Sequence, residues 1–190
     1  NISSNNAFGI LLNSGCPNVI IENNIVSHNR YSGIYIYFLS ENTVIRGNNI
    51  NSNSAGIYLN SADKIDISEN AISYNSEGIH LYESSLNTIN LNSISNNKVG
   101  IWSYQSSTIY ECNNFIMNED DLDLRRDLVR DLMDDSDSSE WYSNYWNGPR
   151  LFPKLIIGWW GRFSWDPYAW LPRLPYVHID WEPAKEPYEI

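Results

Sequence analysis

Five Gly-Ile pairs recur along the first half of the chain and constrain its fold more than any other feature. They stand 24, 23, 22 and 22 residues apart, at 9–10, 33–34, 56–57, 78–79 and 100–101. Two further rows run in step with them: Asn23, Asn48, Asn70, Asn92 and Asn114, and Ile25, Ile50, Ile72, Ile94 and Ile116. Several residue types that recur in register at one period indicate a repeat protein.

Each Gly opens an alternating stretch. Positions one and three after it are mostly Ile or Leu, whereas positions two and four are mostly aromatic or polar, as in Tyr35 and Tyr37. A period of two predicts a strand with one face turned inward. Two shorter apolar runs per period, such as 19–21 and the stretch around Ile25, predict two more strands. Residues 1–118 are therefore expected to form an all-β, right-handed, single-stranded parallel β-helix of about five 22-residue coils, rising about 4.8 Å per coil.

The leucine-rich repeat is the rival interpretation, because it has a similar period and its own Asn row. It requires several leucines per repeat, and the inward positions here are mostly Ile. The second coil is longer than the others, so residues 28–32 and 38–41 are expected to bulge outward at turns.

Asparagine makes up 24 of the first 118 residues. Stacked Asn side chains can hydrogen-bond to the coils above and below, and Asn tolerates the left-handed backbone of a sharp corner. We expect the Asn row to be such a structural ladder.

The charge is concentrated between the repeats and the tail. The chain carries a net charge of −11, and residues 119–140 hold ten acidic and three basic side chains. Leu124, Leu128 and Leu132 follow an acidic start at intervals of four, which predicts an acidic helical cap and linker over 119–140. The absence of a basic stripe argues against nucleic acid as a partner. No run has the length of a transmembrane helix, so no membrane insertion is expected.

Residues 141–190 differ in composition from the repeats. Seven of the eight Trp and seven of the eight Pro lie there. The prolines disfavour long helices and central strands. We expect an irregular, aromatic C-terminal segment packed on the wall of the β-helix.

The outward positions after the Gly row define an aromatic wall. Its rings should stand in rows about 4.8 Å apart and form an apolar patch larger than monomers usually expose. Either the tail or a second subunit covers this wall, or the wall stacks on the sugar rings of a glycan. Its members are Tyr35, Tyr37, Tyr58, His80, Tyr82, Trp102 and Tyr104.

The repeat rows, Asn-Ile-x-x-Asn, Gly-Ile-Tyr-Leu and Asn-Thr-Ile, resemble the parallel β-helix repeats of the NosD type, within the wider carbohydrate-binding and sugar-hydrolase β-helix set. The end of the chain, at 144–150, 153–154 and 180–188, is similar to the tail of archaeal NosD-like surface proteins. The resemblance implies an extracytoplasmic location, at the cell surface, secreted or periplasmic. It also implies copper-site maturation as one alternative function, although the His, Met and Cys residues are scattered.

A polysaccharide lyase or hydrolase on the same fold is the other alternative. It needs convergent acid and base groups, and Asp63, Asp66 and Glu69, the only close acidic group, are not expected to converge. The sequence therefore predicts a non-catalytic surface or secreted scaffold with no catalytic residue, no metal and no cofactor. Its expected partner is a glycan or another surface protein. Because Asn1 already lies within a repeat, a preceding part of a longer chain is also expected.

Overall fold

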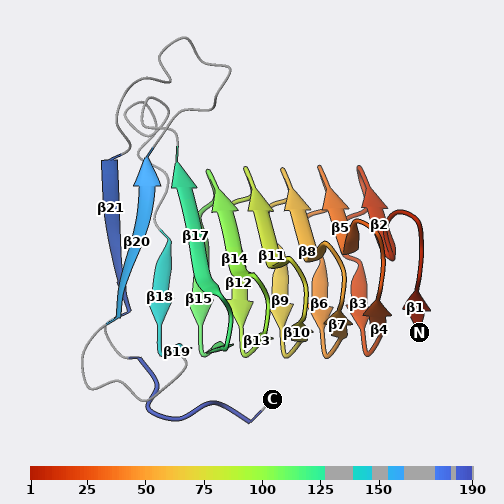
Figure 1. The fold of residues 1–190 in the computed structure, drawn as a ribbon. Helices are drawn as coiled ribbons and strands as arrows, with labels where there is room; N and C mark the ends of the chain where they lie inside the picture. The colour runs from red at the N-terminus through yellow and green to blue at the C-terminus, as the bar shows by residue number, and fades with distance from the viewer. Residues whose placement is uncertain (127–138, 147–153, 161–173, 181–182, 190) are drawn as a thin grey trace.

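The computed structural model describes residues 1–126, 139–146, 154–160, 174–180 and 183–189, and these form a right-handed parallel β-solenoid of about six turns. Three sheets run along the solenoid, and one strand from each makes one coil (Figure 1). The described residues contain strands and no helix. None of them belongs to a helix with the length and apolarity that crossing a bilayer requires.

Sheet A contains the short strands at the predicted Ile row. Neighbouring strands are parallel, and Ile72 pairs with Ile50 on one side and with Ile94 on the other. In order, the strands are β1 (Ile2–Ser3), β4 (Ile25–Ser27), β7 (Asn49–Asn51), β10 (Ala71–Ser73), β13 (Ser93–Ser95), β16 (Asn114–Ile116) and β19 (Tyr145–Trp146).

Sheet B contains the longest strands, which follow the Gly row. The first seven are parallel, and the last pair is antiparallel. In order, they are β2 (Ile10–Asn13), β5 (Ser32–Tyr37), β8 (Ala55–Asn60), β11 (Glu77–Tyr82), β14 (Val99–Tyr104), β17 (Asp120–Arg126), β20 (Lys154–Trp160) and β21 (Leu174–Asp180).

Sheet C closes each coil. Its strands are parallel throughout. They are β3 (Ile20–Glu22), β6 (Val44–Arg46), β9 (Asp66–Ser68), β12 (Asn87–Asn90), β15 (Thr108–Glu111) and β18 (Glu140–Tyr142).

The alternation predicted after each Gly is confirmed. In β8, for example, Ile57 and Leu59 are fully buried, whereas Tyr58 between them is only half-buried. Inward side chains from all three sheets stack in rows along the solenoid and form one continuous apolar core. Each coil therefore buries its apolar face only against the coils beside it, as repeat architectures do.

The Gly row is required by close stacking of successive coils. A Cβ at Gly56 would lie 2.5 Å from the backbone oxygen of Gly78 and 3.1 Å from the side-chain Nδ2 of Asn75. Gly33, Gly78 and Gly100 meet the same two groups of the next coil. Any side chain at these positions would push two coils apart, which is why glycine recurs in register with the strands.

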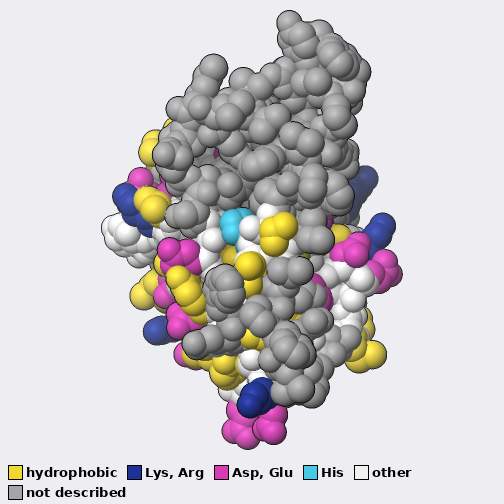
Figure 2. Space-filling model, turned by 90° about the vertical axis from the view of Figure 1, so that its left-hand side faces the viewer, with side chains coloured by type: hydrophobic (Ala, Val, Ile, Leu, Met, Phe, Trp, Pro, Cys, Tyr) yellow, Lys and Arg dark blue, Asp and Glu magenta, His cyan; other side chains and the backbone are white. Residues whose placement is uncertain are grey.

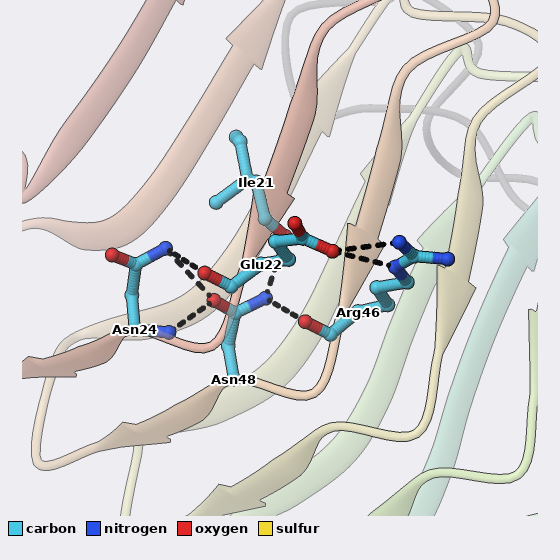
Figure 3. Close-up of polar contacts among 5 residues, drawn as sticks. All are labelled: Ile21, Glu22, Asn24, Arg46 and Asn48. Carbon is cyan, nitrogen blue, oxygen red and sulfur yellow. Dashed lines mark hydrogen bonds and ion pairs between the residues drawn. The ribbon is translucent and has the colours of Figure 1, made fainter.

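The asparagine ladder runs through the corner between sheets C and A. The Oδ1 of Asn48 accepts hydrogen bonds from the backbone N (2.9 Å) and the side-chain Nδ2 (3.2 Å) of Asn24, while its Nδ2 donates to the carbonyls of Ile21 and Arg46 (Figure 3). An ion pair between Arg46 and Glu22 joins the same two coils on the outside of sheet C. The pattern repeats in each coil, so the ladder comprises Asn24, Asn48, Asn70, Asn92, Asn113 and Asn144.

The prediction of Asn23 and Asn114 as ladder members is wrong by one residue at each end. Asn23 has a φ of 56° and stacks beneath Gly47, whose φ is 62°. The ladder residue is always the one after this left-handed corner, so Asn24 takes the place expected for Asn23. A one-residue slip moves a side chain to the other face of a strand. Accordingly, Val26 and not Ile25 pairs with Ile50 in the core.

The same slip occurs in the fifth coil. Cys112 holds the left-handed corner with a φ of 53°, and Asn113 joins the ladder. Asn114 instead begins β16. Phe115, not Ile116, then faces Ile94 in the core.

A second asparagine ladder occupies the corner between sheets A and B. The Oδ1 of Asn75 accepts bonds from the backbone N and Nδ2 of Asn53 at 2.9 and 3.1 Å. Its members are Asn5, Asn29, Asn53, Asn75, Asn97 and Asn118. Asparagine amides thus bridge successive coils at two corners, which accounts for much of the Asn content of the repeats.

The predicted helical cap is contradicted where the structure describes it. Residues 120–126 form β17, in which Leu122 pairs with Ile101 and Leu124 with Ser103. Leu122 and Leu124 lie two residues apart, so the segment follows the strand period rather than the helical one. Residues 127–138, which complete the predicted cap and linker, lie outside the described residues.

The solenoid also continues past residue 118, the predicted end of the repeats. Trp141 of β18 stacks on Tyr110 with ring centroids 3.8 Å apart, and Trp146 of β19 stacks on Phe115 at 4.4 Å. Both tryptophans are buried in the core. The first part of the tail is therefore an additional coil whose aromatic side chains fill the interior, where a segment packed on the outside was expected.

The final described strand ends the first ladder. Asp180, fully buried at the end of β21, accepts bonds through one carboxylate oxygen, Oδ2, from the backbone N (3.0 Å) and Nδ2 (3.3 Å) of Asn144. The same oxygen accepts a bond from Nε1 of Trp146 at 2.9 Å. The antiparallel strand thereby joins the tail to the last coil.

Candidate functional site

The seven predicted wall residues lie on the outer face of sheet B in two rows. Strand pairing places the first row in register from Tyr35 through Tyr58 and His80 to Trp102. The second row runs from Tyr37 through Asn60 to Tyr82 and Tyr104. Sheet B therefore brings all seven side chains onto one face, spaced by one coil.

Rings of the first row pack against one another at tilted angles. The centroids of Tyr58 and His80 are 4.1 Å apart, and those of His80 and Trp102 are also 4.1 Å apart. Tyr35 lies 4.9 Å from Tyr58. Since Tyr58 and His80 each contact a ring on both sides, their ring surfaces are partly covered.

Packing within the row affects the ionisation of Tyr58 and the orientation of His80. Burial between its neighbours raises the pKa of Tyr58 to about 12, and the nearby Tyr35, Tyr82 and Glu77 add to the effect. Nδ1 of His80 lies 2.6 Å from Oε2 of Glu77 in the same strand. A carboxylate in this position fixes the orientation of the imidazole ring.

A cluster of exposed rings adjoins the row in the second coil. Phe8 stacks on Tyr35 at 4.9 Å and lies 5.8 Å from Tyr31, while Tyr37 lies 6.2 Å from Phe38. Tyr31, Tyr37 and Phe38 are 49%, 40% and 46% exposed. We call these three residues the coil-two cluster.

The sequence analysis missed Phe8, Tyr31 and Phe38 because they precede or follow the regular strand. Tyr31 and Phe38 do fall in the two stretches where outward bulges were expected, at 28–32 and 38–41. At the second stretch, Phe38 and Leu39 have φ values of 37° and 56°. A positive φ also follows the corresponding strand in later coils, at Ser61, Glu83 and Gln105, so it belongs to the turn after sheet B.

The proposed covering of the wall by the tail stays a prediction. The described strands of the tail extend the end of sheet B, and residues 147–153 and 161–173 lie outside the described part of the chain. Figure 2 looks onto this end of the solenoid, where described apolar side chains lie beside acidic ones.

The acidic group weighed for catalysis is spread over separate positions. Asp63 accepts a 2.6 Å hydrogen bond from the backbone N of Ser85. Asp66 faces outward in β9, whereas Glu69 occupies a left-handed corner with a φ of 56°. The three residues hold different turn and strand positions and form no site for acid–base chemistry.

A copper site requires a cluster of His, Met or Cys. The described part of the chain contains no group of three or more His, Cys, Asp or Glu side chains able to hold a metal ion. His28 lies at an exposed corner before β5, far along the chain from His80 in β11. Cys16 and Cys112 are free thiols at different coils. Among the described residues, the His and Cys side chains therefore do not gather into a copper site.

The comparison with known families agrees with the repeat pattern. The family model described as periplasmic copper-binding protein (NosD) matches residues 1–151. Neither the curated proteins nor the solved structures contain a match to the chain. The matched region spans all the complete coils that the structure describes and the two tryptophans that close them. The chain belongs to the NosD family.

Proposed function

We propose that this chain is a non-catalytic, extracytoplasmic scaffold that binds glycans through the outer face of sheet B, at the coil-two cluster. The observation that carries the proposal is the exposure of Tyr31, Tyr37 and Phe38 at the two ends of β5. Ring contacts through Phe8 and Tyr35 connect these side chains along the strand. Exposed apolar groups gathered in one place favour an interaction site over a solvated surface.

The geometry favours the second coil over the rest of the wall. Sugar rings stack on the faces of aromatic rings, and the rings of Tyr58, His80 and Trp102 already pack against one another. The coil-two cluster, by contrast, leaves much of its ring surface exposed. Hydrogen-bonding groups lie beside it: Asn60 donates to the hydroxyl of Tyr35, and the Arg30 guanidinium lies 5.5 Å from the Tyr31 ring centre.

Family membership supports the location and the absence of catalysis. The family is described as periplasmic, which agrees with an extracytoplasmic scaffold. The dispersal of Asp63, Asp66 and Glu69 supports a binding role over a lyase or hydrolase role.

A glycan array probed with the intact chain tests the proposal. We expect weak binding that Tyr31→Ala and Phe38→Ala each reduce about fivefold, since one ring contact contributes about 1 kcal/mol. Tyr74→Ala is the matched control, because Tyr74 is an exposed tyrosine at a corner outside both ring rows. Binding that Tyr74→Ala weakens as much as Phe38→Ala, or the lack of any glycan ligand, would contradict the proposal.

The family description also favours a second candidate, an accessory factor in copper handling. Elemental analysis of the purified chain after copper exposure and gel filtration separates the two. We expect less than stoichiometric copper, because the described donors do not cluster. One retained copper ion per chain would favour the accessory role.

A further inference from the structure

The C-terminal residues 183–189 lie against the last coils and make paired contacts with one side chain. Nδ2 of Asn114 donates to the carbonyl of Tyr188 at 2.8 Å, and Oδ1 of Asn114 accepts from the backbone N of Tyr188, also at 2.8 Å. One amide thus satisfies both backbone groups of a single residue. These two bonds engage the backbone of Tyr188, as hydrogen bonds to the main chain do in the recognition of extended peptides.

Two further bonds position the same segment. The Tyr188 hydroxyl donates to the carbonyl of Ser143 at 2.7 Å, and the backbone N of Ala184 donates to the carbonyl of Asn144 at 3.0 Å. Ser143, which accepts the bond from Tyr188, adjoins the corner that holds Cys112, because the backbone N of Cys112 donates to the carbonyl of Tyr142 at 3.1 Å. Burial and the Cys112 thiol raise the pKa of Tyr188 to about 12. The receptor side therefore consists of Asn114, Ser143 and Asn144, which we call the tail site.

Between these contacts the segment is only loosely held. Lys185, Glu186 and Pro187 are exposed, and the four hydrogen bonds join only Ala184 and Tyr188 to the solenoid. Segments with few buried contacts open at low free energy. The tail site itself belongs to the hydrogen-bonded coils of β16, β18 and β19, so we expect it to persist when the segment is released.

We propose that the tail site is a peptide-binding site that the chain's own C-terminal segment occupies, and that it accepts the same segment from a second copy when its own is released. The intramolecular segment has a high effective concentration, so it suppresses the exchange in the intact chain. Weakening the intramolecular segment at Tyr188 should reveal the site.

The test uses the full chain with Tyr188→Ala and a fluorescent peptide of residues 183–190. We expect the peptide to bind this variant at high micromolar to millimolar concentration, and to bind the wild-type chain at least tenfold more weakly. Adding Asn114→Ala should reduce the binding to the variant at least tenfold. Adding Asn49→Ala should leave it unchanged, because Asn49 lies in the same outer row of sheet A three coils away.

Thiol labelling gives a second measurement on the same chains. Tyr188→Ala should increase the labelling rate of Cys112 several-fold and leave that of Cys16, in the first coil, unchanged. Tyr188→Phe, which removes only the bond to Ser143, should give an intermediate rate. No peptide binding by the Tyr188→Ala chain, equal binding after Asn114→Ala, or an unchanged Cys112 rate would each overturn the proposal.

Discussion

Asn70→Ala tests whether the buried amide ladder stabilises the solenoid. Asn70 is fully buried, and its Oδ1 accepts bonds from the backbone N and Nδ2 of Asn48, both at 3.0 Å. Its Nδ2 donates to the carbonyls of Ile45 and Ser68 and to Oδ1 of Asn92. Alanine removes all five of these bonds while leaving the backbone conformation accessible.

The loss of stability depends on which partners of Asn70 are left without any hydrogen bond. Nδ2 of Asn48 still donates to Ile21 and Arg46, and the Ser68 carbonyl still accepts from Gly47. The backbone N–H of Asn48, by contrast, loses its acceptor in a dry corner, which costs about 1–3 kcal/mol. Loss of the donor to Ile45 and the small cavity add about 1–2 kcal/mol. The total of about 2–5 kcal/mol corresponds to a fall in melting temperature of the order of 10 °C for a chain of this size.

Thermal unfolding followed by circular dichroism measures this difference. Asn51→Ala is the control, because the Nδ2 of Asn51 bonds only to the exposed Asn49 in the same strand, and its loss should stay within about 0.5 kcal/mol. If Asn70→Ala and Asn51→Ala melt within about 2 °C of each other, the buried amide ladder does not stabilise the solenoid.

Three further outcomes are expected. Ile72→Asp places a carboxylate between Ile50 and Ile94 in the core and should cost several kcal/mol; a melting temperature within a degree or two of the parent would show that this row is not a dry core. Gly56→Ala brings a Cβ within 2.5 Å of the Gly78 oxygen and should lower the free energy of unfolding in urea by about 1–3 kcal/mol. An unchanged urea midpoint would mean that the two coils can move apart without cost. The pKa of Tyr58 is raised to about 12, above about 10 in the unfolded chain, so its contribution to stability is full below pH 10 and is lost between pH 10 and 12. Tyr58→Phe should therefore flatten the fall in stability over that range, and equal slopes for both chains would contradict the argument.

The interior of the coils could be predicted from the sequence because two constraints coincide there. Alternation after each Gly specifies which side chains point inward, and the recurrence of the Gly itself specifies the coil length. Ile57 and Leu59 are buried as that pattern requires, and the glycine between coils leaves no room for a side chain. Both signals are local in sequence, so they are visible without a structure.

The register at the ends of the Asn row could not be predicted in the same way. At 23–24 and at 113–114 two asparagines stand side by side, and either could continue the row. The backbone decides between them, because the residue before each ladder Asn takes a positive φ. Residues as different as Gly47, Leu91 and Cys112 fill that corner position, so no side-chain pattern marks it.

The segment after the fifth Gly-Ile pair illustrates a choice between two periods. Leucines at intervals of four suggested a helix, while Leu122 and Leu124 at an interval of two fit a strand. The strand prevails at 120–126 because the exposed edge of β14 supplies hydrogen-bonding partners for it, with Leu122 opposite Ile101. Tertiary pairing of this kind overrides a short local pattern.

The candidate site was predictable only where it coincides with the repeat. The wall residues follow from strand alternation, since outward positions of aligned strands must form rows. Tyr31 and Phe38 lie in turns, where neither alternation nor the period places a side chain. Phe38 lies in a turn with left-handed backbone at Phe38 and Leu39, and no residue type in the sequence predicts that conformation.

A solenoid of near-identical coils has no intrinsic end, so its end must be encoded by a residue that differs from the repeat. In the first ladder, each Asn from Asn48 to Asn144 accepts hydrogen bonds at Oδ1 from the Asn of the coil before it. Its backbone N–H donates to the next member, so the N–H of the last Asn needs a different acceptor. A carboxylate accepts without donating. One carboxylate oxygen of Asp180 accepts hydrogen bonds from the backbone N and the Nδ2 of Asn144 and from the Nε1 of Trp146. Asp180 lies at the end of the antiparallel strand β21. Asp180 therefore both ends the ladder and joins the tail to the last coil, because it stands in the place of the next ladder Asn and belongs to the tail.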